Sequence, residues 1–174
     1  MPHRFDTVLA DRLVTLFQEF QVADVCHGKR SLLTHLLGTF SLLERWGGTQ
    51  ELVLAGLCHS VLGTAAYERP ELRATAAGAE RLRWAIGDEA AALVANYRVM
   101  TWRTVVAACR GVSGPFPVML REMATLHAAN LVEQWTAVKQ HTAPAQLAQY
   151  VNESRDLLPF LPSAAAAAVR AIIT

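Results

Sequence analysis

Apolar residues recur along most of the chain at the three- and four-residue spacing of amphipathic helices. No stretch shows the strict alternation of apolar and polar residues, flanked by hairpin turns, that is typical of strands. The spacing predicts helices over 6–20, 31–46, 49–63, 80–86, 88–100, 101–109, 116–140, 144–158 and from 163 onward. Residues 64–78 predict a loop with one short helix over 70–77. The fold class predicted is therefore all-α.

The predicted helix boundaries carry suitable capping and breaking residues. Asp6 and Thr49 can act as N-caps, and the Gly-Gly turn at 47–48 precedes Thr49. The segment 111–115, Gly-Val-Ser-Gly-Pro, is the clearest break in the chain. Neither an internal repeat nor a linker long enough to separate two domains is present. We therefore expect residues 1–174 to form one compact, single-domain helical bundle.

The composition narrows the class of partner. Hydrophobic residues make up 52% of the chain and charged residues 18%, which favours a thick core, a lined cavity or an oligomer interface. We therefore expect a homodimer. The formal net charge is +1 and like charges form no block, so nothing builds the basic surface that binding nucleic acid requires.

The chain also lacks the sequence features of a membrane or secreted protein. No apolar run is long enough to cross a bilayer, and the first residues contain no hydrophobic signal segment. The three cysteines have no paired close spacing, which predicts reduced thiols and a cytoplasmic location. Cys58 has no basic cluster around it to make it nucleophilic, and neither of the two Cys-His pairs has the spacing of a zinc site.

Two histidines stand in helices that are otherwise apolar. His35 has Ser31, Gly38 and Thr39 on or beside its helix face, and small residues also surround His59. Two imidazoles facing each other across such a gap could bind a metal, transfer a proton or orient a polar ligand. Each histidine taken alone could equally be a hydrogen-bonded core residue.

The tract Ser-Leu-Leu-Thr-His-Leu-Leu-Gly-Thr-Phe, followed by Leu-Val-Leu-Ala-Gly-Leu-Cys-His-Ser, resembles the first two metal-binding helices of the HD-domain superfamily. More narrowly, Ala-Gly-Leu-Cys-His-Ser-Val-Leu-Gly-Thr is similar to an uncharacterised bacterial HD-like family with the tract Ala-Gly-Leu-x-His-Ser-x-Tyr-Gly-Thr. The likeness covers roughly residues 27–135 and departs from that tract at Leu62, where the family has tyrosine. It implies an HD-like helical fold.

The resemblance also implies positions for a metal site. His35, His59 and Ser60 align with the histidine and the His-Asp pair of the superfamily, and Asn130 aligns with its later aspartate. Superfamily phosphohydrolases and diiron oxygenases hold their cations with carboxylates, which offset the charge of the desolvated metal. Since Ser60 and Asn130 are neutral, we expect no tightly held metal. His35 and His59 are the metal ligands if a divalent cation is bound at all.

A polar stripe runs along the long helix predicted after residue 116. His127, Asn130 and Gln134 follow one another at helical spacing among Met, Leu, Val and Ala. A buried polar side chain without a partner costs about 1–3 kcal/mol, so the stripe is either a hydrogen-bond network or part of a pocket. A second group, Tyr97, Arg98, Trp102 and Arg103, could bind a carboxylate but is more typical of surface packing.

These residues together suggest an enzyme that acts on a small organic molecule. In this interpretation His35 and His59 are the catalytic acid and base, and Ser60, His127, Asn130 and Gln134 bind the substrate in a mostly apolar pocket. One alternative is a non-catalytic ligand-binding or scaffold protein with the same fold. Another is a metal-dependent hydrolase or oxygenase.

Overall fold

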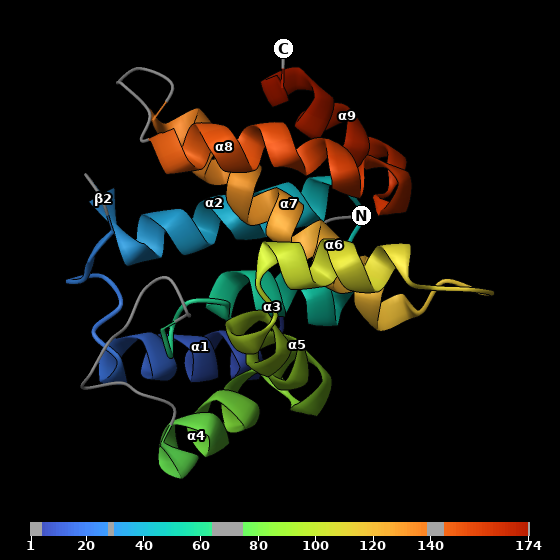
Figure 1. Ribbon diagram of the computed structural model, residues 1–174. Helices are drawn as coiled ribbons and strands as arrows, with labels where there is room; N and C mark the ends of the chain where they lie inside the picture. The colour runs from blue at the N-terminus through green and yellow to red at the C-terminus, as the bar shows by residue number, and fades with distance from the viewer. Residues whose placement is uncertain (1–4, 28–29, 64–74, 139–144, 174) are drawn as a thin grey trace. The chain divides into compact units, whose positions relative to one another are not determined.

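The computed structural model describes residues 5–27, 30–63, 75–138 and 145–173, and most of these residues are helical (Figure 1). The all-α prediction is therefore confirmed. The described residues group into two units, residues 1–99 and 100–174, each with its own packing, and we describe each unit by itself. The prediction of one domain over 1–174 stays a prediction.

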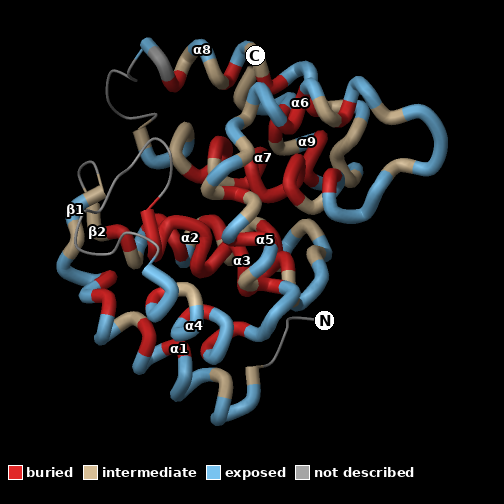
Figure 2. Tube along the Cα trace, turned by 60° about the horizontal axis from the view of Figure 1, so that its bottom comes forward, coloured by how far each residue is buried: buried red, intermediate tan, exposed pale blue. Residues whose placement is uncertain are grey.

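The N-terminal unit contains five helices in its described part. They are α1 (Thr7–Glu19), α2 (Leu32–Arg45), α3 (Gln50–Cys58), α4 (Ala76–Ile86) and α5 (Asp88–Val99). Helix α3 packs against α2 and α5, and α1 packs against α4. All residues of α3 from Leu52 to Cys58 are buried, and Figure 2 shows the buried residues of this unit concentrated on α2, α3 and α5. The core of the unit therefore surrounds α3.

The C-terminal unit is built around one long helix. It contains α6 (Trp102–Arg110), α7 (Val118–Val138), α8 (Ala145–Glu153), the 3-10 helix η2 (Ser154–Phe160) and α9 (Ser163–Ile173). Helices α6, α8, α9 and η2 all contact α7. Eleven residues of α7 are buried, which explains why its sequence is apolar on most faces.

Capping residues begin the helices where the sequence predicts them. The side chains of Asp6, Ser31, Thr49 and Thr101 each accept a hydrogen bond from a backbone N–H in the first turn of α1, α2, α3 and α6, respectively. Each bond satisfies one donor that has no partner within its helix. A polar residue followed by an apolar stripe therefore marks the start of each of these four helices.

The structure corrects several element predictions. A short antiparallel pair, β1 (Cys26–His27) and β2 (Arg30–Ser31), lies where only a break was expected, because two-residue strands are too short to show alternation. Helix α4 begins after its N-cap Thr75 and runs through Gly78, so no separate helix ends at 77. The rest of the predicted helix, residues 70–74, lies outside the described part of the chain.

The third correction concerns the predicted helix 144–158. The α-helix ends at Glu153, and the chain continues as the 3-10 helix η2, which contains Pro159. Proline has no N–H to donate to the residue four positions earlier, and its ring crowds that carbonyl. A tighter 3-10 turn accommodates the proline near its end.

Within the described residues, no helix combines the length and apolarity needed to cross a membrane.

Candidate functional site: a buried histidine pair

The packing of α2 against α3 brings His35 and His59 together. His35 lies in the first turns of α2, and both side chains are fully buried. His59 is the C-cap of α3 rather than a residue inside it, so the predicted helix 49–63 is wrong at its end. Gly56 lies one turn earlier on α3, where a Cβ would overlap the side chain of Leu43 on α2. The absence of a side chain there lets the two helices approach closely.

The two imidazoles are joined directly by a hydrogen bond. The distance between His35 Nε2 and His59 Nε2 is 3.1 Å, and the two rings meet edge to face. At the other side of His59, Nδ1 lies 2.8 Å from the carbonyl oxygen of Gly56. At the other side of His35, Nδ1 lies 3.5 Å from Nη2 of Arg30. We call His35 and His59 the histidine pair.

The outer contacts of the histidine pair fix where the protons lie when both rings are neutral. A carbonyl oxygen only accepts, so Nδ1 of His59 must carry a proton and donate it to Gly56. A neutral imidazole has one N–H, so Nε2 of His59 then holds a lone pair. His35 must therefore donate from Nε2, and its Nδ1 is left to accept from Arg30, a group that only donates. The two outer contacts agree on the same arrangement.

Two further rings surround the histidine pair. His27, on β1, stacks on His35 with ring centroids 4.5 Å apart. Tyr97, on α5, meets His59 edge to face with centroids 5.1 Å apart. Tyr97 is buried, and burial raises the pKa of its phenol, so the hydroxyl is neutral at physiological pH. His27 and Tyr97 thus cover parts of the two imidazoles, whereas Arg30 places a charged group beside His35.

The sequence interpretation of Tyr97 as part of a surface group is wrong. Tyr97 is buried against His59, and Arg98 donates from Nε to the carbonyl oxygen of Gly63. Trp102 and Arg103 belong to the C-terminal unit, where Arg103 forms an exposed ion pair with Glu153. The helical spacing of Tyr97 with the buried Leu93 and Val94 was the available signal that it faces the core.

The other predicted site residues fall into two groups. Ser60 follows His59 directly and is buried in the same unit. His127, Asn130 and Gln134 lie on α7, in the C-terminal unit. His127 donates from Nε2 to the carbonyl oxygen of Met100 at 2.9 Å, and Gln134 donates to Oδ1 of Asn130 at 3.1 Å. These are two separate hydrogen bonds, and Asn130 and Gln134 are half-buried. A continuous network along the stripe and a pocket shared with the histidine pair both stay predictions.

Burial governs the protonation of His127. Desolvation lowers the pKa of its imidazole to about 4, although the hydrogen bond to the Met100 carbonyl acts in the opposite direction. Trp102 contacts the ring edge to face. His127 is therefore neutral at pH 7, with its proton on the nitrogen that faces Met100.

The arrangement of the histidine pair does not suit a metal bound by both Nε2 atoms. Their 3.1 Å separation is short enough for two ligands of one ion at the usual Zn–N distance of about 2.1 Å. Binding would nevertheless require His35 to move its proton to Nδ1, where it would face the N–H of Arg30. Among the residues that the structure describes, no group of three His, Cys, Asp or Glu side chains could complete such a site.

The cysteines offer no alternative chemistry at this site. Cys58 is fully buried, and desolvation raises the pKa of its thiol, which disfavours the thiolate needed for nucleophilic attack. Cys26 is exposed on β1, and Cys109 is buried on α6, where burial likewise raises its pKa. The histidine pair is thus the main chemically distinctive feature of the N-terminal unit.

Comparison with known families finds a similarity that includes this site. Residues 16–101, just under half of the chain, match a domain of unknown function, DUF6817. The matched segment contains both members of the histidine pair, as well as Arg30, Ser60 and Tyr97. No curated protein and no solved structure shows a significant match. The match ends within two residues of the boundary between the two units.

Proposed function

We propose that this chain is an enzyme that acts on a small organic molecule, with the histidine pair as its acid–base centre and without a tightly held metal. The observation that carries the proposal is the 3.1 Å hydrogen bond between two fully buried imidazoles. Imidazoles exchange protons near neutral pH, and a low-dielectric environment strengthens their interaction with a bound substrate. The HD-like sequence tract and the segment 16–101 that matches a domain of unknown function both include the pair, which supports the proposal.

The proton arrangement assigns a different role to each histidine. Nε2 of His59 holds the lone pair and is the base that takes a proton from the substrate. Nε2–H of His35 is the donor that stabilises negative charge developing on a substrate oxygen or nitrogen. Arg30 donates to the far nitrogen of His35, which keeps the donor proton on Nε2. A substrate would insert between the two Nε2 atoms and replace their mutual hydrogen bond.

Ser60 and Tyr97 are the groups of the same unit that we propose to shape the substrate site. Ser60 is adjacent to the base, and Tyr97 covers an edge of the His59 ring. His127, Asn130 and Gln134 are proposed as further substrate-binding residues, and this role depends on the pocket predicted from the sequence.

A general-base probe tests the catalytic role. In 5-nitrobenzisoxazole, a base removes the proton on C3 while the ring N–O bond breaks, and the coloured product is 2-cyano-4-nitrophenolate. His59 Nε2 would receive the proton, and His35 would donate a hydrogen bond to the phenolate oxygen. We expect His59→Gln and His35→Gln to lose most of the protein-dependent rate, of the order of 10²-fold for the base. Arg81→Gln, on the surface of α4, is the control that should keep the rate.

Metal analysis of the same preparations separates the alternatives. We expect mass spectrometry of untagged protein, purified without chelator, to find no stoichiometric transition metal. Near-stoichiometric metal that disappears in both histidine variants would instead support the hydrolase or oxygenase alternative. Equal probe turnover by the folded wild type and both variants would contradict the acid–base role. Thermal stabilisation by pocket-sized ligands without turnover would then favour a non-catalytic binding protein.

A further inference from the structure

A second concave site lies in the C-terminal unit, where the segment before α7 meets the turn between η2 and α9. The hollow has a volume of about 400 Å³ and is lined mainly by apolar residues. Phe116 and Phe160 stack nearly parallel on its wall, with ring centroids 5.1 Å apart. Pro159 and Pro162 extend the apolar lining. The volume is within the range of small-molecule sites, and the half-buried ring of Phe160 offers a flat surface for another ring.

One charged group borders this apolar hollow. The guanidinium of Arg121, in the first turns of α7, lies over the ring of Phe116 at 5.9 Å from its centroid. Arg121 makes no ion pair within the part of the chain that the structure describes. This cation–π contact with Phe116 uses no hydrogen bond, so the N–H groups of the guanidinium can pair with a carboxylate.

Between Phe116 and Arg121 in the sequence, the chain also exposes apolar side chains. Val118 and Met119, at the start of α7, are 67% and 40% exposed. Exposed apolar side chains next to half-buried aromatic rings are typical of a binding surface, whereas single exposed apolar residues are not. A ligand that covers the rings and neutralises Arg121 would complement both properties of this surface.

We propose that this hollow binds a small carboxylic acid with an aromatic ring. The ring of the ligand packs against Phe160 and the neighbouring prolines, and its carboxylate forms a charge-assisted pair with Arg121. The site lies within the C-terminal unit and involves none of the residues of the histidine pair. It is therefore independent of the proposed acid–base function.

Titration of the full chain with 3-phenylpropionate, followed at the backbone amide signals of residues 116–121 and 159–163, tests the proposal. For a ligand of this size we expect saturable shifts with a dissociation constant on the order of 1 mM. Two matched probes separate the contributions, since 3-phenylpropionamide lacks the charge and propionate lacks the ring. Both should bind at least about 10-fold more weakly.

Two variants complete the test. Arg121→Met keeps the apolar stem and should weaken 3-phenylpropionate by about 10-fold or more while leaving the amide probe unchanged. Arg170→Met removes an exposed arginine elsewhere on α9 and should leave the affinity unchanged. The proposal is overturned if 3-phenylpropionate causes no saturable shift in these two segments at 20-fold its expected dissociation constant. Equal binding of acid and amide, or of wild type and Arg121→Met, would overturn it as well.

Discussion

The direction of the hydrogen bond within the histidine pair is determined by the outer nitrogen of each ring. Gly56 accepts from Nδ1 of His59, and Arg30 faces Nδ1 of His35. We expect long-range ¹H–¹⁵N spectra at neutral pH to show the Nδ1–H tautomer for His59 and the Nε2–H tautomer for His35. His127, which donates from Nε2 to a carbonyl, provides an internal reference for the second tautomer. The reverse assignment of either member would contradict the roles of base and donor.

At the same scale, the low pKa of His127 predicts that stability depends on pH. Its folded-state pKa is about 4, whereas an unperturbed histidine titrates near 6.5. Between these values the unfolded chain binds the proton and the folded protein does not. The contribution of His127 is therefore complete above about pH 6.5 and is lost as the pH falls toward 4, by on the order of 3 kcal/mol in total.

Urea unfolding at pH 7.5 and pH 5 measures this effect. The wild-type free energy of unfolding should fall between the two pH values, and His127→Gln should show a smaller decrease because glutamine does not titrate. Glutamine can still donate to the Met100 carbonyl, so the variant keeps a polar partner in the buried position. An identical pH dependence of the two proteins would show that His127 titrates normally.

At the scale of elements, the contact between α2 and α3 depends on Gly56. Alanine favours a helix over glycine by about 1 kcal/mol, so Gly56→Ala would be stabilising if space allowed. The added Cβ would overlap Leu43, which is fully buried and whose movement would disturb a packed core. We expect a net loss of about 1–3 kcal/mol in the free energy of unfolding.

A matched glycine provides the control. A Cβ at Gly111, the C-cap of α6, would have its nearest neighbour at 3.5 Å, and its φ of −80° suits any residue. Gly111→Ala should therefore leave the urea midpoint unchanged or raise it slightly. If both variants behaved alike, close approach of α2 and α3 at Gly56 would not be the limiting contact. A shift of the His59 side-chain signals in Gly56→Ala alone would show that this contact also positions the histidine pair.

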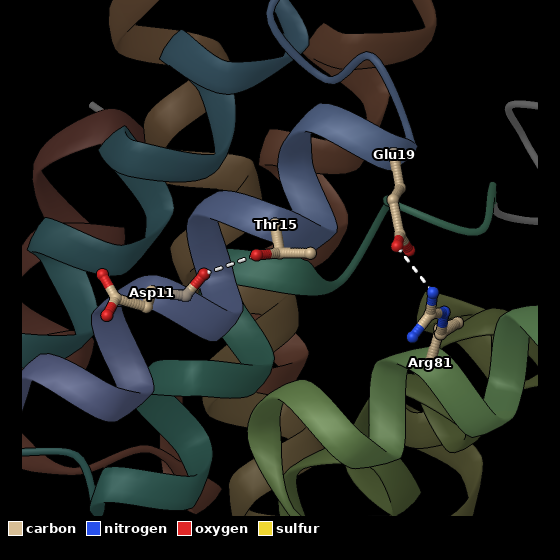
Figure 3. Close-up of polar contacts among 4 residues, drawn as sticks. All are labelled: Asp11, Thr15, Glu19 and Arg81. Carbon is tan, nitrogen blue, oxygen red and sulfur yellow. Dashed lines mark hydrogen bonds and ion pairs between the residues drawn. The ribbon is translucent and has the colours of Figure 1, made fainter.

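The surface between α1 and α4 illustrates contacts that add little. Thr15 donates to the carbonyl of Asp11 within α1, and Arg81 pairs with Glu19 at 2.7 Å across the two helices (Figure 3). Both members of the ion pair are substantially exposed, at 55% and 36%. Exposed pairs contribute about 0–1 kcal/mol, because solvent screens them. Arg81→Gln is for this reason a suitable control for the activity measurements.

Helix positions could be predicted because the signals that set them are local. The cap and apolar stripe of α1, α2, α3 and α6 are adjacent in sequence, so the pattern identified these helix starts. The contact between His35 and His59 was also anticipated, through the order of residues in the HD-like tract. The contact between Tyr97 and His59 was not anticipated, because it depends on how α3 packs against α5. The 3-10 helix η2 was not predicted either, because the apolar pattern of 144–158 does not show how Pro159 changes the turn before it.

At the scale of the whole molecule, the apolar composition still predicts self-association. Val8, Val99 and Val118 are each more than half exposed in the described structure, in a chain with 52% hydrophobic residues. We expect a homodimer by size-exclusion chromatography with light scattering, since pairing would cover such side chains. A chain that remains monomeric at high concentration would contradict this prediction.

The division into two units leads to a prediction about independent folding. The N-terminal unit ends at residue 99, and the family match ends at residue 101, although one comes from spatial contacts and the other from sequence. Five described helices, with α3 the most completely buried of them, give this unit a core of its own, and the length of the unit is typical of a domain. We therefore expect a fragment of residues 1–101 to be helical and to unfold cooperatively.

Circular dichroism and calorimetry of this fragment would decide between one domain and two. A cooperative transition, together with the His35 and His59 tautomers of the full chain, would show that the proposed acid–base centre needs only the N-terminal unit. The geometry of the pair would then not depend on the residues of α7. A fragment that is mostly unfolded would instead support the single domain predicted from the sequence, because its core would be insufficient without residues 102–174.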